Sequence, residues 1–423
     1  MTFISGRIII TASSRKGGTS LNTSQTSLTE GSIWKTMLLF ALPVLIGNIF
    51  QQLYNAFDAW CVGYFIGDDA LAAVSSSGGL IFLMVSFFNG LAMGAGVVIA
   101  RQYGARQYDI MGKAIHTAIA FGMVTGILLT IFGVIFTPTI LTWMGTPSDV
   151  LPQSILYFRY YFCGAIFIVM YNIFVGILHA VGDSRHPLYY LIFSTGVNIA
   201  LDLLFVAVLK MGVGSAAVAT TISQGVSALL CCIHLLRVDA PYRVSLKQIR
   251  IDRKSLSDII RFGFPSGVQN SVIAFANVIV QTNINSFGKF AVAGCGSYSK
   301  LEGFAFLPVT CFSQALATFV GQNLGAHRYD RVKKALALAL PAAASWQRSL
   351  AFSLISLRPS SSAYSAIPRK PLTLVLDICR PFVCFTAFWH SPTAFLPFFV
   401  AQERPLFPCT PCWAVGAFSG SAT

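Results

Sequence analysis

Charged side chains are scarce in this chain, and their scarcity excludes most soluble classes of protein. Only 10% of the 423 residues are charged, whereas 55% are hydrophobic and the mean hydropathy is +0.68. A soluble globular domain carries about 25% charged residues. Apolar runs long enough to cross a bilayer recur instead, near 36–64, 74–100, 114–137, 155–180, 188–210, 214–236, 264–286, 295–320 and 333–356. The composition therefore predicts an all-α polytopic membrane protein.

Several sequence signals of other functional classes are also missing. The chain has no phosphate-binding loop of the form G-x-x-x-x-G-K-[ST], so we expect neither ATP-driven pumping nor enzymatic activity. The apolar stretch 8–10 is too short to be the core of a secretion signal. The ten cysteines form no disulfide framework, and Cys409 and Cys412 make a lone C-x-x-C without the further ligands that a zinc site requires. We expect no cofactor and no bound metal other than a coupling cation.

The net charge of +14 is distributed as in a membrane protein and not as in a nucleic-acid-binding protein. Basic residues gather in alternate loops, near 101–113, 185–186, 237–254 and 327–334, while the intervening loops are poor in cations. The basic side of a polytopic protein faces the cytoplasm. We therefore expect a multi-pass protein of the plasma (cell inner) membrane with a cytoplasmic N-terminus, in contact with the lipid bilayer and not with nucleic acid.

The chain repeats itself. The motif G-A-x-x-Y-D occurs at 104–109 and again at 325–330, a spacing of 221 residues. The stretch F-A-L-P ending at Pro43 has a counterpart, F-G-F-P, ending at Pro265, at nearly the same offset. Six predicted spans separate the copies, so both halves have the same orientation in the membrane. The pattern predicts two parallel-repeat lobes, a known transporter design.

Two carboxylates lie inside predicted spans of the first half. Counting 1.5 Å per helical residue places Asp58 roughly 14 Å, and Asp202 and Thr220 roughly 12 Å, from the outer ends of their spans. Asn198 is four residues before Asp202 and so shares its helix face. We expect these four residues to converge at one depth.

The predicted cluster has more than one chemical interpretation. Carboxylate, amide and hydroxyl oxygens suit a small cation, and burial with mutual repulsion would equally let a carboxylate carry a proton. The alternative is a hydrogen-bond network that only stabilises helix packing. We favour the functional interpretation because ionisable groups within the membrane usually mark transport pathways.

Other polar residues and glycines in the spans give weaker signals. Asn48, Gln52 and Asn55 precede Asp58 at helical spacing, and are candidates either to line the same cavity or to hydrogen-bond between helices. Glu302 is the acidic residue of the second lobe's spans and is either a second acidic site or, near a helix start, a partner of Lys300. The glycines of the second span, Gly90, Gly94 and Gly96, predict close helix packing.

In combination these motifs resemble the multidrug and toxic compound extrusion (MATE) family. The resemblance covers roughly residues 30–345. It rests on Pro43…Asn55-Ala-Phe-Asp58, Gly104-Ala…Tyr108-Asp109, Gly182-Asp183…Pro187, Asn198-Ile-Ala-Leu-Asp202, Pro265 and Gly321-Gln-Asn-Leu-Gly325-Ala. It implies twelve helices in two six-helix lobes around a central cavity, and export of organic, often cationic and aromatic, compounds in exchange for Na⁺ or H⁺.

The resemblance also implies roles for single residues. One branch of the family binds its coupling cation through an Asp on helix one, an Asn and an Asp on helix five, and a Thr on helix six. Asp58, Asn198, Asp202 and Thr220 occupy the matching positions. Glu302 matches an acidic residue on helix eight that other members use.

The sequence changes character after about residue 345. Residues 341–423 hold ten of the eighteen prolines, and arginines interrupt each apolar stretch. Proline breaks helices, so this density forbids three further clean spans. We predict a flexible tail (1–31), a first lobe of six helices (32–236), a cytoplasmic linker (237–262), the start of a second lobe with about three helices (263–345), and an aberrant tail (346–423). A frameshift would explain this tail; the alternative is a divergent C-terminus with short re-entrant helices.

Three functions fit these features. The first is a cation-coupled multidrug antiporter, which we expect to be a monomer acting on drug-like small molecules. The second is a flippase of lipid-linked precursors, whose cavity would be strongly cationic, although the spans here contain almost no Lys or Arg. The third is a non-transporting, truncated remnant, which the unusual tail favours.

Overall fold

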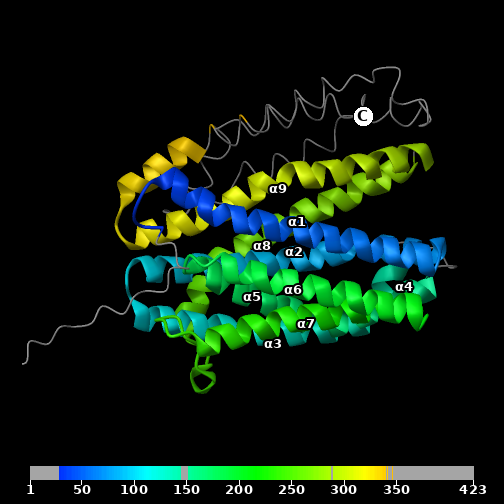
Figure 1. Cartoon of the computed structure of the whole chain (residues 1–423), viewed down its shortest axis with the longest axis horizontal. Helices are drawn as coiled ribbons and strands as arrows, with labels where there is room; N and C mark the ends of the chain where they lie inside the picture. The colour runs from blue at the N-terminus through cyan, green and yellow to red at the C-terminus, as the bar shows by residue number, and fades with distance from the viewer. Residues whose placement is uncertain (1–27, 144–150, 287–288, 340, 342–344, 346–423) are drawn as a thin grey trace, which may run out of the picture.

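The computed structural model describes residues 28–143, 151–286, 289–339, 341 and 345. Within these ranges every regular element is helical (Figure 1), which confirms the predicted all-α class. The predicted tail 346–423, and residues 1–27 of the predicted tail 1–31, lie outside the described residues.

The first half of the chain forms a bundle of long helices. These are α1 (Ile33–Phe65), α2 (Asp68–Gly104), α3 (Tyr108–Trp143), α4 (Leu151–Cys163), α5 (Ala165–Ala180), α6 (Arg185–Asp202) with the π-helical segment η1 (Leu203–Val208), and α7 (Val213–Arg237). The predicted span 155–180 is bent by 45° between α4 and α5. At the break, Gly164 packs against the side chain of Thr221 on α7, which leaves no room for a Cβ atom.

Several helices have the length and composition of membrane spans. Among the described residues, Ile33–Phe65, Tyr108–Thr142, Arg185–Val208 and Val213–Arg237 are long and apolar enough to cross a bilayer, and the bent pair α4 and α5 adds a fifth. Helices α2, α8 (Arg253–Ser286) and α9 (Lys289–Gly325) are 34 to 37 residues long. At 1.5 Å per residue each exceeds the roughly 30 Å of the hydrocarbon core.

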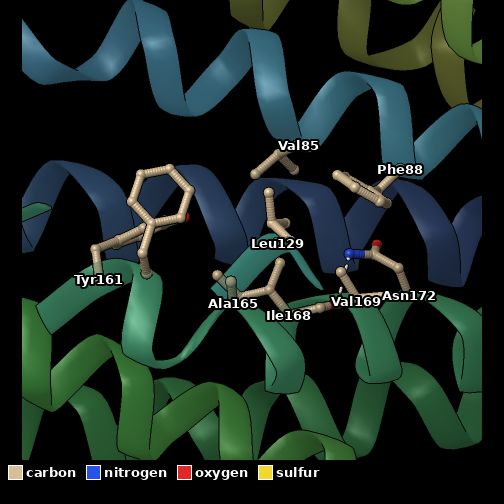
Figure 2. Close-up of a pocket in the computed structure, with 9 residues that line it drawn as sticks. Val85, Phe88, Leu129, Tyr161, Ala165, Ile168, Val169 and Asn172 are labelled. Atoms are coloured by element: carbon tan, nitrogen blue, oxygen red, sulfur yellow. Dashed lines mark hydrogen bonds between the residues drawn. The ribbon is translucent and has the colours of Figure 1, made fainter. Parts of the chain in front are cut away.

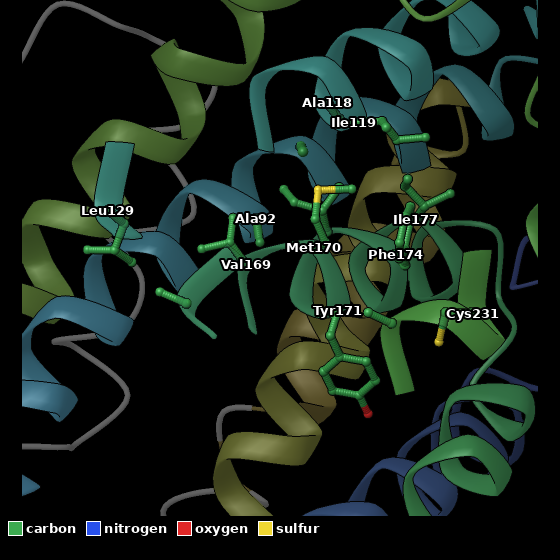
Figure 3. Close-up of a cluster of buried hydrophobic side chains, with 14 of the residues drawn as sticks. Ala92, Ala118, Ile119, Leu129, Val169, Met170, Tyr171, Phe174, Ile177 and Cys231 are labelled. Atoms are coloured by element: carbon green, nitrogen blue, oxygen red, sulfur yellow. The ribbon is translucent and has the colours of Figure 1, made fainter. Parts of the chain in front are cut away.

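Helix α5 occupies the centre of the first bundle. Figure 3 shows side chains of α5, from Val169 to Ile177, among residues of α2, α3 and α7. Small residues such as Ala92 and Ala118 let the neighbouring helices approach it closely. Because lipid tails are as apolar as leucine, this close van der Waals packing, and not the hydrophobic effect, stabilises a bundle inside a bilayer.

The predicted internal duplication is visible in the backbone. The third residue of each G-A-x-x-Y-D copy, Arg106 or His327, has a φ of 56°, and the same hydrogen-bond pattern closes both turns. Pro43 and Pro265 lie inside α1 and α8, the first helices of their halves. After the second copy the chain continues as a helix over residues 329–339. Two halves with one local geometry confirm the parallel-repeat prediction.

The two halves meet through glycines. A Cβ atom at Gly90 or Gly94 on α2 would overlap the backbone of Gly267 or Gly263 on α8, so the predicted close packing of these two glycines is confirmed. Gly96 instead lies at ordinary contact distance from α5. The two repeat motifs also touch, because a Cβ atom at Gly325 would overlap the backbone of Ala105.

Hydrogen bonds also join the two halves, at the end of the molecule where the basic loops lie. Gln322 Nε2 of α9 donates a 2.7 Å hydrogen bond to the carbonyl oxygen of Ala180. Asn323 Nδ2 donates to the carbonyl oxygen of Leu28, and Arg331 Nη1 donates to that of Gly31. The residues before α1 are thus tied to the second half.

The predicted linker 237–262 includes the first ten residues of α8, which begins at Arg253. The part before α8, which contains the 3-10 helix η2 (Leu246–Gln248), crosses α3 near its N-terminal end. His116 Nε2 accepts the backbone N–H of Ser245, and Thr117 Oγ1 accepts that of Asp252, both at 3.0 Å. The linker is therefore fastened to the first bundle along its length.

Candidate functional site

The structure buries all four polar residues that the sequence predicts to converge. Asp58 lies on α1, Asn198 and Asp202 on α6, and Thr220 on α7, and these three helices pack against one another. Asp202 is fully buried, and the other three side chains are at most 8% exposed. Six of their polar atoms have no hydrogen-bond partner among the described residues: Asp58 Oδ1, both terminal atoms of Asn198, both oxygens of Asp202 and Thr220 Oγ1.

Asp202 lies where the helix changes type. α6 ends at this residue, and the next six residues form the π-helical segment η1. π-helical turns are rare and frequently occur at functional sites. This wider turn packs against both α1 and α7, which carry Asp58 and Thr220.

The two carboxylates form one electrostatic unit. A negative charge on Asp58 acts on Asp202, and both groups are removed from solvent. A buried carboxylate without a partner is so unfavourable that it normally binds a cation or takes up a proton. Carboxylate, amide and hydroxyl oxygens are hard ligands of the kind that alkali and alkaline-earth cations prefer. These four residues, Asp58, Asn198, Asp202 and Thr220, are called the carboxylate cluster below. The cluster can bind a small cation or exchange a proton.

Aromatic residues that the sequence analysis missed surround the cluster. Tyr54 of α1 and two tyrosines of α4, Tyr157 and Tyr161, are buried or half-buried within electrostatic reach of Asp58. Tyr54 also lies close to Thr220, although the two hydroxyls are not aligned as a hydrogen bond. The available signal was helical spacing: Tyr54 is four residues before Asp58, and the two tyrosines of α4 are four residues apart.

A small apolar pocket lies next to Tyr161 (Figure 2). It lies between α2, α3, α4 and α5, and Tyr161 lines it as well as approaching Asp58. Its polar lining group, the amide of Asn172, donates its own hydrogen bond to the carbonyl oxygen of Ile168 at 2.8 Å. The remaining lining residues are Val85, Phe88, Leu129, Phe162, Ala165, Ile168 and Val169. The pocket thus offers an apolar surface beside a polar cluster.

The weaker candidates fall elsewhere on α1 and α9. Asn48 Nδ2 donates to Cys311 Sγ of α9 at 3.0 Å, so it lies between the halves and not in the carboxylate cluster. Gln52 is half-buried and Asn55 exposed, on the same face of α1 as Asn48. Glu302 lies well inside α9, which begins at Lys289, so the expectation that it lies near a helix start is wrong. Its side chain lies outside the described part of the structure.

Comparison with known proteins agrees with the fold and the motifs. The family model MatE matches residues 43–204 and 265–360. The probable multidrug resistance protein YoeA of Bacillus subtilis is 30% identical over 316 residues, covering 73% of this chain and 68% of YoeA. The multidrug export protein MepA of Staphylococcus aureus is 23% identical over 299 residues, covering 71% of this chain and 66% of MepA.

Solved structures show the same fold. A multidrug resistance MATE family transporter in an outward-facing conformation superposes with a TM-score of 0.78 at 24% identity, covering 88% of this chain and 83% of that one. A MATE crystal structure in the bent conformation gives a TM-score of 0.76 at 25% identity, with coverages of 86% and 81%. Both similarities extend across the two halves of the chain.

Proposed function

The chain belongs to the MATE family of membrane transporters, and from this premise we propose that it is a cation-coupled multidrug antiporter. Its substrates would be organic, often cationic and aromatic, compounds. The coupling ion, Na⁺ or H⁺, would bind at Asp58, Asn198, Asp202 and Thr220. The observation that carries this proposal is the pair of buried carboxylates, in which Asp58 Oδ1 and both oxygens of Asp202 have no hydrogen-bond partner among the described residues.

Coupling follows from differential binding. A ligand that binds two conformations equally shifts neither, so cation and drug must prefer different states. We propose that the cation enters the carboxylate cluster from the outer side and disfavours the drug-bound outward-open state. The glycine contacts between α2 and α8, and between α2 and α9, would close the basic, cytoplasmic end in that state.

The substrate path is proposed to run between the two halves. The face of α1 that carries Asn48, Gln52 and Asn55 points toward the second half, as a cavity lining would. The spans contain almost no Lys or Arg, which supports drug-like substrates over pyrophosphate-bearing lipids. We further propose an inner-membrane location, a cytoplasmic N-terminus and a monomeric state.

Dye efflux from cells that express the full chain tests the proposal. We expect the unaltered chain to lower dye accumulation, and Asp58→Asn and Asp202→Asn each to abolish cation-dependent efflux without preventing membrane insertion. Asp239→Asn, which removes the same charge from an exposed position after α7, is the matched control. Undiminished efflux in both cluster variants would contradict the assignment of the site. No efflux by the unaltered, correctly inserted chain would contradict transport and favour a non-transporting remnant.

A further inference from the structure

Two histidines and an aspartate gather at the opposite ends of the helices that carry the carboxylate cluster. Asp183 lies in the turn between α5 and α6, His186 in the first turn of α6, and His234 in the last turn of α7. One ligand atom from each residue lies within 4.8 Å of the other two. His186 and His234 are 48 residues apart in the sequence, so only the packing of α6 against α7 brings them together.

The distances suit a metal ion of the zinc class. Asp183 Oδ2 lies 2.6 Å from His186 Nδ1 and 3.9 Å from His234 Nε2. Ligands about 2.0–2.1 Å from a tetrahedral zinc ion are about 3.3 Å apart, between these two values, so small side-chain rotations would suffice. Two imidazoles and a carboxylate are typical ligands of Zn²⁺ and related transition metals, with a fourth position left for water.

Neighbouring groups orient the ligand atoms. Asp183 Oδ1 accepts the backbone N–H groups of Arg185 and His186, both at 3.2 Å, which leaves Oδ2 facing the imidazoles. The Tyr190 hydroxyl lies 3.0 Å from His234 Nδ1, on the side of the ring away from Asp183. Such outer partners fix the tautomer and the orientation of metal-binding histidines.

A simple ion pair explains only part of this arrangement. An Asp183–His186 pair at the start of α6 accounts for the 2.6 Å contact. It does not account for His234, whose Nε2 is buried without a hydrogen-bond partner among the described residues and is too far from Asp183 to form one. The rings of His186 and His234 also lie only 4.3 Å apart between centroids. A bound cation would satisfy Nε2 and explain why the two imidazoles converge.

We propose that Asp183, His186 and His234 form a binding site for a divalent transition-metal ion of the zinc class. The ion would link the α5–α6 turn to the end of α7. These are the basic ends of α6 and α7, roughly 20 Å along the helices from Asp202 and Thr220. The site is independent of the proposed transport, and a metal there would restrain the relative movement of two helices of the carboxylate cluster.

Metal binding by the purified full chain tests the proposal. The protein is prepared in detergent with an affinity tag free of histidine, stripped with a chelator and titrated with Co²⁺ alone, and then with Zn²⁺ in competition. We expect one Co²⁺ per chain with the visible absorption of a tetrahedral site, and its displacement by Zn²⁺. We expect His186→Gln and His234→Gln each to weaken binding at least tenfold, whereas His327→Gln, at an exposed histidine after α9, leaves it unchanged.

Tyr190→Phe provides a second test that removes only the outer hydrogen-bonding group. Because loss of such a partner typically lowers metal affinity 10- to 100-fold, we expect a reduction in this range with unaltered stoichiometry. The melting temperature of each metal-free variant shows whether it is folded. Absence of a bound ion in the unaltered chain would overturn the proposal. Equal affinity in the unaltered chain and in folded His186→Gln and His234→Gln variants would overturn it as well.

Discussion

Replacing Asp202 with asparagine removes one carboxylate from the first half of the chain while keeping the size of the side chain. Asp202 is fully buried, and neither of its oxygens has a hydrogen-bond partner among the described residues. Burying an unpaired charge costs several kcal/mol, and burying an unsatisfied neutral polar group costs about 1–3 kcal/mol. In the absence of a coupling ion we therefore expect Asp202→Asn to be at least as stable as the unaltered protein.

When the coupling ion is present, we expect the unaltered protein to be more stable than Asp202→Asn. A ligand at 100 times its dissociation constant stabilises the folded protein by about 2.7 kcal/mol. We expect the unaltered protein to gain stability of this size on addition of Na⁺ or, if the proton is the ligand, on lowering the pH. Asp202→Asn should lose this gain, because the remaining neutral side chain replaces a charged ligand.

Thermal unfolding of the detergent-purified chain measures the effect. NaCl is compared with choline chloride at the same ionic strength, and each series is repeated at two pH values. Asp239→Asn, exposed after α7, controls for the loss of one negative charge. If Asp202→Asn keeps the full ion-dependent gain in melting temperature, Asp202 is not a ligand of the coupling ion and the electrostatic argument fails.

Two further predictions concern the contacts between elements. Gly94→Ala would place a Cβ atom into the backbone of Gly263, and we expect overpacking of about 1–3 kcal/mol to lower the melting temperature. Gly112→Ala, where nothing lies within 4 Å, should not lower it, and equal effects of the two would contradict the glycine contact. Thr117→Val removes the acceptor of the backbone N–H just before α8 and should cost about 0.5–1.5 kcal/mol in the free energy of unfolding. Thr130→Val removes a buried hydroxyl that has no hydrogen-bond partner in the described part of the chain, and should be neutral or stabilising in the same assay. A larger loss of stability at Thr130 than at Thr117 would refute this reasoning.

Some features of the site were predictable because they depend on local spacing along single helices. Asn198 and Asp202 are four residues apart, so any helix places them on one face. Asp58 and Thr220 lie at similar distances from the ends of their predicted spans, which brings them to the same depth once the helices stand side by side. The duplication of the G-A-x-x-Y-D motif was likewise predictable from the amino-acid sequence alone. The structure adds that the turns of its two copies have the same geometry.

Other features were not predictable because they depend on which helices become neighbours. The tyrosines of α4 come within electrostatic reach of Asp58 because α4 packs against α7, the helix that carries Thr220. Spacing left Asn48 as a candidate either to line the cavity or to hydrogen-bond between helices, and its amide donates to Cys311, a residue 263 positions away. Helical periodicity predicts which residues share a face of a helix, but it does not predict which other helix that face packs against.

The sequence by itself determined the class, the two-fold repeat and the residues of the carboxylate cluster. Scarcity of charge, long apolar runs and two acidic residues within them are one-dimensional properties, and bilayer thickness with helical rise converts them into spans and depths. Only the tertiary structure decided the π-helical turn after Asp202, the glycine contacts between the halves and the meeting of His186 with His234. These depend on the distances between helix axes and on their rotations, which side-chain packing sets and sequence spacing leaves free.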